Sequence, residues 1–363
     1  MATAEELLLS VQDSLEGTPY ACTALKVLTG GTGNFVYRGT LATVLPSGEE
    51  TIVIKHSEGY VALHPDFKLE ISRCDFEQSI LTSLETLPAA ATAGFSITTP
   101  RLYYFDSSAN TQVYSDLNSS VDLKTYCLAH GTSLKAERCT GLGRALGLWS
   151  KQFHAWGAAP AQEGVRETIR GNTALRDLKY AINYAQVVAT VPKFPEILAS
   201  SKEIFEEVAK EVKERIDRDE GTLIHGDFWT GNILLPNTPF SVDQPQVNMY
   251  VIDWELVHLG SVAYDLGQIF AELFELKHFK GIEAGSQLIA AFMQGYGRLE
   301  DDLAFKVAIH VGVHLIRWGS SVPGWGTQEQ VERVVEIGRD FFVQGWKKDK
   351  GSFNGTVLDC LFA

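Results

Sequence analysis

The segment that decides the fold reads IHGDFWTGNILL, from Ile224 to Leu235. Its polar residues follow the spacing HxDxxxxN, with His225, Asp227 and Asn232 at the fixed positions, and it runs into an apolar strand pattern. Phosphoryl transfer requires a carboxylate near the attacking hydroxyl and oxygen ligands for Mg²⁺. The segment therefore predicts a catalytic loop, in which Asp227 accepts or orients the hydroxyl proton and Asn232 binds the metal. Three fixed positions also arise by chance, so the loop needs supporting features.

A second segment, MYVIDWE from Met249 to Glu255, runs an apolar strand directly into two carboxylates. Acids at the end of a buried strand are costly unless a cation or hydrogen bonds compensate them. Mg²⁺ would do so, and we expect Asp253 to bridge the metal to the β- and γ-phosphates. Glu255 either reaches a second ion or a metal-bound water, or only caps a loop.

A glycine-rich turn lies between two strand patterns near the N-terminus and consists of Gly30, Gly31, Thr32, Gly33 and Asn34. Glycine tolerates positive φ and lets the backbone come close to an anion, so this turn can fold N–H groups over phosphates. It lacks the GKS/T ending of a Walker loop and the helix of a dinucleotide fingerprint. A plain hairpin turn explains it equally well.

Lys55 ends the apolar strand 52–54, and Glu77 lies on the next helical pattern. Glu77 shares a helix face with Ile80 and Leu81, so it points inward and can pair with Lys55. Taken singly, such residues usually lie on the surface. Taken in order, the glycine turn, lysine, glutamate, HxDxxxxN and aspartate are the parts of a kinase active site.

Strand and helix patterns divide the chain into two parts. The first part alternates polar and apolar residues and predicts strands with one inserted helix, at 23–28, 35–44, 51–55, 100–105 and 111–114, with the helix at 75–87. The second part is largely helical, for example over 200–219, and is interrupted by a strand pair, 232–235 and 249–252, around the loop 236–248. We expect an N-terminal nucleotide-binding lobe at 1–112, a hinge at 113–120 and a C-terminal catalytic lobe at 121–363.

The two quoted segments, extended as VIDWELVHLGSVAYDLGQIFAEL from Val251 to Leu273, resemble the aminoglycoside phosphotransferase and choline kinase superfamily, in particular its fungal phosphotransferase members. The form Asp253-Trp254-Glu255 is similar to that of methylthioribose kinases and fungal hydroxytryptamine kinases. The resemblance implies an α+β, bilobal, protein-kinase-like fold, with a small antiparallel N-terminal sheet carrying one helix and a large, mainly helical C-terminal lobe. It implies ATP and Mg²⁺ as cofactors.

The resemblance also assigns roles residue by residue. Asp227 is the base, Asn232 and Asp253 bind metal, and His225 braces the loop. Lys55 is the phosphate clamp with Glu77 as its partner. In the family, a buried aspartate at the start of a helix accepts hydrogen bonds from the catalytic loop, and Asp265 matches that position. The backbone of the family's hinge contacts adenine, and the matching residues here are Val113, Tyr114, Ser115, Asp116 and Leu117.

The composition limits the kinds of partner that this protein can bind. The formal net charge is −14, the wrong sign for tracking a nucleic-acid backbone, and no apolar run reaches membrane-spanning length. An acidic surface attracts a cationic acceptor, but it is also an ordinary solubility feature. Five scattered cysteines without CxxC spacing and an N-terminus lacking the basic start of a signal peptide favour a reducing, cytoplasmic setting.

The acceptor pocket is the least readable part of the sequence. Its candidates are Trp229, Glu255, His314, Arg317, Trp318 and Trp325. Aromatic rings stack on an indole or enclose an amine, whereas Arg317 suits an anionic or sugar-like group. The helix that carries Trp318 is equally explained as core.

The leading function is ATP-dependent phosphorylation of a hydroxyl group on a small metabolite: an amino alcohol, a hydroxyindole, an aminoglycoside or a sugar-like molecule. A protein kinase is the alternative enzyme, but HGD replaces HRD and little chain remains for an activation loop. A catalytically inactive nucleotide-binding scaffold is the alternative from another class. Monomer and homodimer both remain open.

Overall fold

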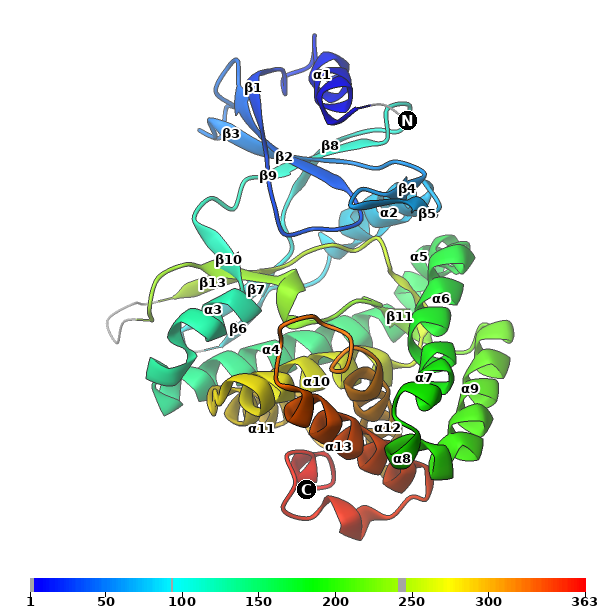
Figure 1. Cartoon of the computed structure of the whole chain (residues 1–363). Helices are drawn as coiled ribbons and strands as arrows, with labels where there is room; N and C mark the ends of the chain where they lie inside the picture. The colour runs from blue at the N-terminus through cyan, green and yellow to red at the C-terminus, as the bar shows by residue number, and fades with distance from the viewer. Residues whose placement is uncertain (1–2, 93, 241–245) are drawn as a thin grey trace. The chain divides into compact units, whose positions relative to one another are not determined.

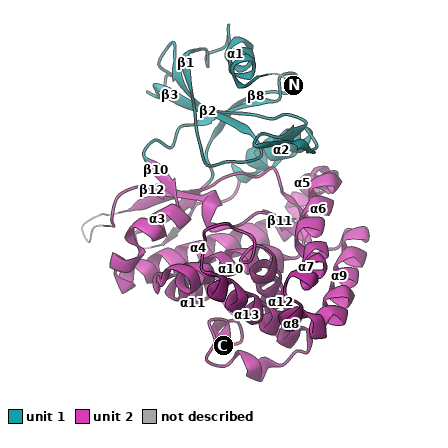
Figure 2. Cartoon of the chain, in the orientation of Figure 1, with its two compact units in different colours: residues 1–85, 99–119 teal, residues 86–98, 120–363 magenta. Residues whose placement is uncertain are grey.

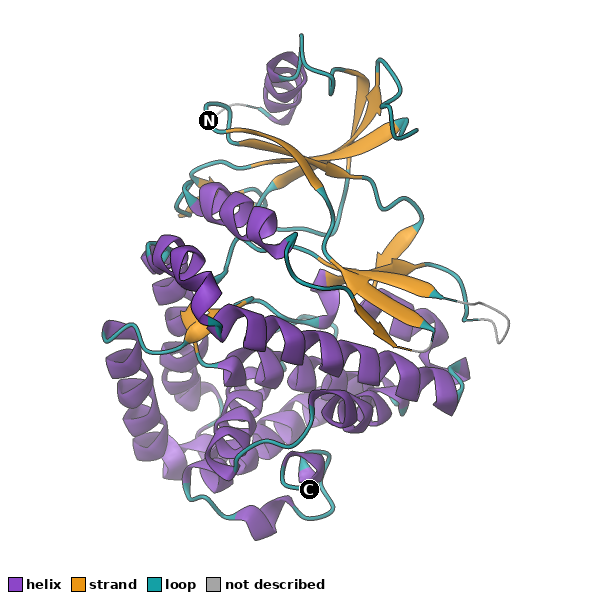
Figure 3. Cartoon of the chain, turned by 180° about the vertical axis from the view of Figure 1, so that it is seen from behind, coloured by secondary structure: helices purple, strands orange, loops and turns teal. Residues whose placement is uncertain are grey.

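The computed structural model describes residues 3–92, 94–240 and 246–363. The chain separates into two compact units: unit 1 comprises residues 1–85 and 99–119, and unit 2 comprises residues 86–98 and 120–363 (Figures 1 and 2). Unit 1 is built mainly of strands, and unit 2 is mainly helical (Figure 3). The predicted α+β class is confirmed, while the predicted boundaries at 112 and 120 stay a prediction.

Unit 1 is a five-stranded sheet with the strand order β1-β2-β3-β9-β8, in which every neighbouring pair is antiparallel. Its elements are α1 (Ala4–Ser14), β1 (Cys22–Val27), β2 (Phe35–Leu41), β3 (Thr51–His56), β4 (Tyr60–Val61), β5 (His64–Lys68), α2 (Arg73–Leu84), β8 (Leu102–Asp106) and β9 (Thr111–Ser115). The predicted strands and the predicted helix correspond to β1, β2, β3, β8, β9 and α2, with ends shifted by up to three residues. The β4–β5 hairpin is additional.

Helix α1 is a second helix in this unit and covers part of the sheet. Thr3 caps it with a capping box, since the Thr3 side chain accepts from the Glu6 N–H and the Glu6 carboxylate accepts from the Thr3 N–H. Its buried Val11 packs, together with Leu15, among the sheet residues of one apolar cluster. The apolar face of α1 is therefore part of the core of unit 1.

Among the described residues, unit 2 contains most of the helices and two groups of short strands. Its elements are β6 (Ala90–Thr92), β7 (Phe95–Thr98), β10 (Ser120–Asp122), α3 (Leu123–His130), α4 (Ala136–Ala158), α5 (Glu163–Arg170), α6 (Thr173–Tyr180), a π-helical segment (Ala181–Ala185), α7 (Gln186–Thr190), α8 (Pro195–Leu198), α9 (Lys202–Asp217), β11 (Thr222–Ile224), β12 (Ile233–Pro236), β13 (Val247–Val251), β14 (His258–Gly260), α10 (Val262–Lys280), α11 (Ala284–Tyr296), α12 (Asp301–Arg317) and α13 (Gln328–Trp346). The predicted helix 200–219 corresponds to α9, and the predicted strand pair corresponds to β12 and β13.

A mixed sheet of unit 2, with the order β10-β12-β13-β7-β6, positions the two segments singled out by sequence. β12 and β13 pair antiparallel, whereas β7 pairs parallel with β13, which brings residues 86–98 into this unit. The predicted loop 236–248 joins β12 to β13, but its residues 241–245 lie outside the described part of the chain.

The helical core of unit 2 rests on a close crossing of α4 and α11. A Cβ atom at Gly147 would collide with the backbone of Phe292, and one at Gly295 would collide with the backbone of Arg144. Small residues at these positions let the two helices approach closely. Within the ranges that the structure describes, no helix is both long and apolar enough to cross a membrane.

Candidate active site

The HxDxxxxN segment forms a tight loop between β11 and β12. Gly226 has a φ of +78°, and a Cβ atom there would collide with the carbonyl oxygen of Leu256. Only glycine fits both the conformation and the space, so the glycine of the HGD motif is explained by geometry. The loop then passes through a 3₁₀ turn, Thr230–Asn232, and enters β12.

Asp265 fixes the first half of the loop. Its carboxylate accepts hydrogen bonds from the backbone N–H of His225 at 2.8 Å and of Gly226 at 3.0 Å, and it lies 3.1 Å from Nε2 of His154. Burial alone would raise the pKa of Asp265, but the interactions with His154 and His225 outweigh it, so the pKa is lowered. Asp265 stands in the first turn of α10, where the helix dipole also favours a negative charge.

His225 joins the loop to the strand that carries Asp253. Burial lowers the pKa of His225 despite the carboxylates around it, so the ring is neutral at pH 7. A single neutral tautomer satisfies both nitrogens: Nε2 donates to the carbonyl oxygen of Ile252 at 3.0 Å, and Nδ1 accepts from the Asp227 N–H at 3.2 Å. The ring also packs on Trp254, with centroids 4.4 Å apart. In this structure His225 orients the loop through backbone contacts.

Asp227 lies at the centre of a polar network. Its Oδ1 accepts from Gln268 Nε2 at 2.8 Å and from Lys179 Nζ at 3.1 Å, and its Oδ2 accepts from Asn232 Nδ2 at 3.1 Å. Burial would raise the pKa of Asp227, but Lys179, Gln268 and His225 together outweigh it, so the pKa lies below its ordinary value. Asp227 is therefore an ionised acceptor at neutral pH, and 23% of its side chain stays exposed.

Asn232 ties the catalytic loop to the Asp-Trp-Glu loop. Its amide nitrogen Nδ2 donates to the backbone carbonyl oxygen and to Oδ2 of Asp227, so the carbonyl oxygen Oδ1 is the atom of this side chain that could bind a cation. Its backbone carbonyl accepts from the Ile252 N–H at 3.0 Å. Asp253 directly follows Ile252 in the sequence and has a φ of +66°, a costly conformation for a residue with a side chain. Strain of this kind is typical of functional positions.

The two carboxylates of the Asp-Trp-Glu loop lie together. One oxygen of Asp253 and one of Glu255 are within 4.8 Å of each other. Asn172 stabilises this loop, since its Nδ2 donates to the carbonyl oxygens of Glu255 at 3.1 Å and Val257 at 2.8 Å. With Oδ1 of Asn232 nearby in the connected loop, the donor set consists of hard oxygen ligands, which suit Mg²⁺.

Three residues of this network were not predicted from the sequence: Lys179, Gln268 and Asn172. A signal existed for Gln268, because it follows Asp265 by three residues on α10 and so shares its helix face. Lys179 and Asn172 lie 48 and 83 residues from their partners Asp227 and Glu255, and no local pattern connects them.

In unit 1 the predicted lysine and glutamate do meet. Lys55 Nζ lies 2.9 Å and 2.7 Å from the two carboxylate oxygens of Glu77, and both side chains are buried. Ile80 and Leu81 of α2 are buried on the same helix face, as the spacing predicts.

The glycine turn and the predicted hinge belong to unit 1 as well. Gly30 has a φ of +123°, and a Cβ atom at Gly30 or Gly31 would meet open space. Asn34 is different, because its buried Oδ1 accepts from Ser57 Oγ at 2.9 Å and from Arg73 Nη2 at 2.8 Å, which anchors the end of the turn. In the hinge, Val113, Tyr114 and Ser115 end β9, and the Asp116 carboxylate is held by Arg38 and Thr51.

The predicted acceptor residues of unit 2 separate into two groups. Trp229, His314 and Trp325 gather around two buried glutamates of α10: His314 Nε2 lies 3.2 Å from Glu272, and Trp325 Nε1 donates to Glu275 at 3.0 Å. The Trp229 ring lies 5.5 Å from Nζ of Lys124, which in turn pairs with Glu272.

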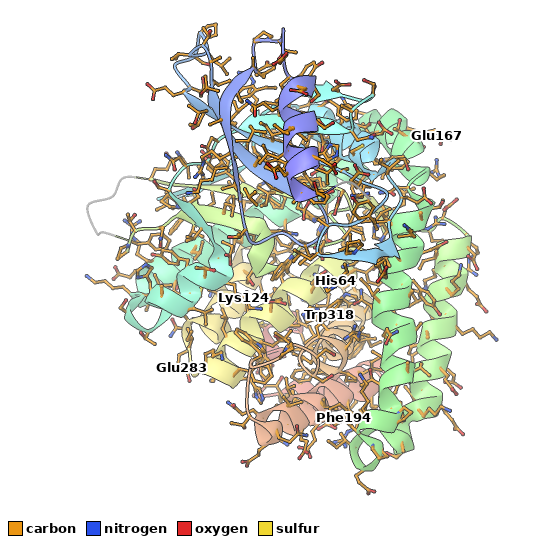
Figure 4. All side chains as sticks on the ribbon, turned by 45° about the horizontal axis from the view of Figure 1, so that its top comes forward. His64, Lys124, Glu167, Phe194, Glu283 and Trp318 are labelled. Atoms are coloured by element: carbon orange, nitrogen blue, oxygen red, sulfur yellow. The ribbon has the colours of Figure 1, made fainter. Side chains whose placement is uncertain are left out.

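Arg317 and Trp318 make other contacts at the end of α12. The Arg317 guanidinium lies over the Trp318 ring, 4.6 Å from its centroid, and Trp318 Nε1 donates to Asn183 at 2.9 Å. Figure 4 labels Trp318 together with Lys124 of α3.

Comparison with known proteins agrees with these features. The family model described as "Phosphotransferase enzyme family" matches residues 61–305. The phosphotransferase FrzJ of Cladobotryum sp is 29% identical over 368 residues, which cover 97% of this chain and 95% of that protein. The 4-hydroxytryptamine kinase of Psilocybe cyanescens is 24% identical over 360 residues, which cover 98% of this chain and 96% of that protein.

Solved structures show the same fold. The wild-type aminoglycoside 2'-phosphotransferase-IIIa in its GDP complex is 15% identical, with a TM-score of 0.51 over 94% of this chain and 99% of that one. The ethanolamine kinase of Plasmodium vivax is 14% identical, with a TM-score of 0.51 over 99% of this chain and 91% of that one. The predicted protein-kinase-like fold is thereby confirmed.

Proposed function

Because this chain belongs to the phosphotransferase enzyme family and is a kinase of small-molecule hydroxyl acceptors, we propose that its acceptor carries a protonated amine beside the hydroxyl group that is phosphorylated. The family uses ATP, and we propose ATP with Mg²⁺ as the phosphoryl donor. The proposal builds on the loop from His225 to Asn232, whose carboxylate is ionised and already oriented by three side-chain donors.

Asp227 is the proposed base. Phosphoryl transfer passes through a loose transition state, so the protein contributes mainly positioning and charge compensation. The lowered pKa of Asp227 means that its carboxylate accepts a hydrogen bond from the acceptor hydroxyl and takes the proton as the bond to phosphorus forms. Lys179 and Gln268 hold this carboxylate in one orientation, and Asn232 holds its other oxygen.

Asn232, Asp253 and Glu255 are the proposed Mg²⁺ ligands. They fit the ion because they offer an amide oxygen and two carboxylates, and because two of these carboxylate oxygens lie within 4.8 Å of each other. Bound Mg²⁺ would compensate charge on the β- and γ-phosphates. The positive φ of Asp253 supports this assignment, because strained backbone of this kind is typical of functional positions.

Lys55 and Glu77 are the proposed nucleotide-side pair of unit 1. A buried ammonium held on both carboxylate oxygens of Glu77 has a fixed position, so it can meet the α- and β-phosphates without a further loss of side-chain freedom. The glycine turn 30–34 and the backbone of Val113 to Leu117 are the proposed contacts of phosphate and adenine.

The acceptor class is supported by the surroundings of α10. Glu272 and Glu275 are buried with the rings of Trp229 and Trp325 close by, which suits a cation better than an anion or a neutral sugar. A 4-hydroxytryptamine kinase is among the relatives of similar length, and the molecule in its name combines a hydroxyindole with an amine. We therefore place hydroxylated aromatic amines and amino alcohols ahead of sugar-like acceptors.

Cytoplasmic placement is part of the proposal. Cys22, Cys74, Cys127 and Cys139 are buried free thiols, and Cys360 is a half-buried free thiol. Unpaired thiols of this kind suit a reducing compartment.

The test is a coupled ADP-release assay with acceptors that differ in one group. 4-Hydroxytryptamine, choline and ethanolamine are compared with 4-hydroxyindole, which keeps the hydroxyl but lacks the amine, and with a thioribose-type sugar. We expect turnover only with the three acceptors that carry a positively charged nitrogen, phosphorylated products identified by mass spectrometry, and no product with Asp227→Ala. Efficient phosphorylation of 4-hydroxyindole or of the sugar, and of no amine, would refute the acceptor class.

A further inference from the structure

The ammonium group of Lys124, on the first turn of α3, lies in an aromatic and acidic surrounding. Its Nζ is 4.3 Å from the ring centroid of Trp325, 5.5 Å from that of Trp229 and 3.1 Å from Glu272 Oε2. A cation within about 6 Å of an indole face is attracted by the ring quadrupole. Lys124 therefore occupies a position that would bind an alkylammonium ion.

Two buried glutamates of α10, Glu272 and Glu275, lie at this position. Glu272 pairs with Lys124 and with His314, and Glu275 accepts a hydrogen bond from Trp325 Nε1 and lies 4.0 Å from His314 Nε2. Only 1% of the Glu275 side chain is exposed, and among the described residues its Oε1 has no hydrogen-bond partner. Burial and the neighbouring Glu272 raise the pKa of Glu275 well above its ordinary value. Glu275 therefore favours its neutral form, and Glu272 is the carboxylate with which an ammonium ion pairs at this position.

The site adjoins the catalytic loop. Thr230 Oγ1 donates to the same Glu272 oxygen that pairs with Lys124, at 3.3 Å, and Trp229 and Thr230 follow Asp227 by two and three residues. An acceptor with its amine at Glu272 would therefore lie next to the loop that carries the proposed base.

Lys124 is suited to leave this position. Its side chain is 19% exposed at the edge of the cluster and reaches Glu272 on a flexible four-carbon stem. Lys280, the other lysine over the Trp325 ring, instead donates to the Trp325 carbonyl oxygen at 2.6 Å. If one ammonium replaces another, Glu272 keeps a counter-ion at every stage, so the exchange avoids an uncompensated buried carboxylate.

We propose that Lys124 is a specificity-determining residue whose ammonium fills the acceptor's amine site in the acceptor-free protein and is displaced by that amine. The inference rests on the proposed function for its substrate class. A neutral acceptor cannot replace the charge of Lys124 beside Glu272, so the lysine excludes it. An amine acceptor can replace that charge, although it has to compete with Lys124 for the site.

The first experiment measures binding of tetramethylammonium, a cation without a hydroxyl group, by quenching of tryptophan fluorescence and by calorimetry without nucleotide. Lys124→Met is expected to bind it about tenfold tighter than the unsubstituted protein, the gain expected when a competitor that fills the site about 90% of the time is removed. Lys124→Arg keeps the competitor and is expected to show no gain. Equal or weaker binding by Lys124→Met would overturn the proposal.

A second measurement needs no substitution. Acetylation of individual lysines is followed by mass spectrometry with and without tetramethylammonium, and Lys202, 53% exposed on α9, is the internal reference. Displacement predicts faster acetylation of Lys124 relative to Lys202 when tetramethylammonium is added. An unchanged or slower rate would show that Lys124 is a fixed structural ion pair.

Failure of the proposed function is distinguishable from failure of this inference. If no amine is phosphorylated but tetramethylammonium still displaces Lys124, the cation site stands and the acceptor class is wrong. If amines are phosphorylated while Lys124→Met leaves their KM unchanged, the inference about Lys124 fails alone. Glu272→Gln is the matched control, expected to weaken tetramethylammonium binding in either background.

Discussion

Lys179 Nζ lies 3.1 Å from Asp227 Oδ1, so α6 places a cation against the carboxylate of the HxDxxxxN loop. Lys179 is itself nearly buried and also donates to Gln268 Oε1 at 3.3 Å, while Gln268 Nε2 donates to Asp227. The three side chains form a closed triangle. A carboxylate held in this way keeps one orientation before an acceptor binds, as the proposed role of Asp227 as the base requires.

The first prediction concerns this triangle. Lys179→Met is expected to lower kcat about 10- to 100-fold, part of what general-base catalysis contributes, with the KM for ATP unchanged. Lys179→Arg should restore part of the activity. Lys202→Met, at an exposed position on α9, is the control, and steady-state kinetics together with thermal unfolding separate the effect from misfolding. Full activity in Lys179→Met would assign the lysine a purely structural role.

The second prediction concerns the proposed metal ligands. Asp253→Asn keeps the shape of the side chain but removes a charge, so it is expected to weaken Mg²⁺ binding and to lower kcat by orders of magnitude. Calorimetric titration of Mg²⁺ in the presence of ADP measures the first effect without turnover. Glu255→Gln is expected to weaken binding less, because Asp253 keeps its charge and Asn172 still holds the loop through the backbone carbonyl oxygen of residue 255. Unaltered Mg²⁺ binding by Asp253→Asn would exclude it as a ligand.

The third prediction separates stability from activity at the Lys55–Glu77 pair. Lys55→Met removes the ammonium that compensates a buried carboxylate, so it is expected to destabilise unit 1 by about 3–5 kcal/mol and to abolish turnover. The double variant Lys55→Met/Glu77→Leu replaces the pair by apolar groups and should recover most of the stability but none of the activity. Urea unfolding and ADP release measure the two outcomes. Recovery of activity in the double variant would show that Lys55 serves the fold alone.

Much of the fold was predictable from local patterns. Lys55 and Glu77 were placed by strand and helix periodicity, and both lie where the periodicity puts them. Asp227, Asn232 and Asp253 were found because they stand at fixed spacings in two short loops. These features depend on residues close in the sequence, where strand alternation and helix spacing act directly.

The remainder depends on contacts between distant segments. Lys179 reaches Asp227 across 48 residues, and Lys124 reaches Glu272 across 148. The parallel pairing of β7 with β13 also joins segments that no local pattern relates. A helical pattern does not distinguish a buried glutamate such as Glu275 from a solvent-exposed one. The sequence shows on which face of the helix the residue lies, but it does not show which other segments pack on that face.

The fourth prediction concerns acid stability. Burial lowers the pKa of His258 to about 4, from an ordinary value near 6.5. Between these two values the unfolded state binds more protons than the folded state, so the free energy of unfolding falls as the pH is lowered through this window. Across the whole window, one such histidine changes the free energy of unfolding by about 3 kcal/mol.

His258→Gln is therefore expected to flatten the pH dependence of urea unfolding between about pH 6.5 and about pH 4, although it lowers stability at neutral pH by disturbing the packing around Gly226. His64→Gln, at an exposed position of β5, should leave the slope unchanged. His310 is buried with a pKa also well below its ordinary value, so some slope will persist. An unaltered slope in His258→Gln would contradict the assignment.

The last prediction concerns the crossing of α4 and α11. Trp149 and Phe153 of α4 pack against Phe228 and Trp254 of the two proposed active-site loops. Gly147→Ala would drive a methyl group into the backbone of Phe292, which cannot rotate away as a side chain can, so we expect a loss of about 1–3 kcal/mol or more. Gly164→Ala is the matched control: Gly164 is exposed on α5, its added methyl group meets open space, and replacing a helical glycine by alanine should stabilise the protein by about 0.5–1 kcal/mol. The same substitution is thus expected to destabilise the protein at Gly147 and to stabilise it at Gly164. Thermal unfolding of both variants decides the matter, and a stabilising effect at Gly147 would mean that the two helices do not approach as closely as the structure has them.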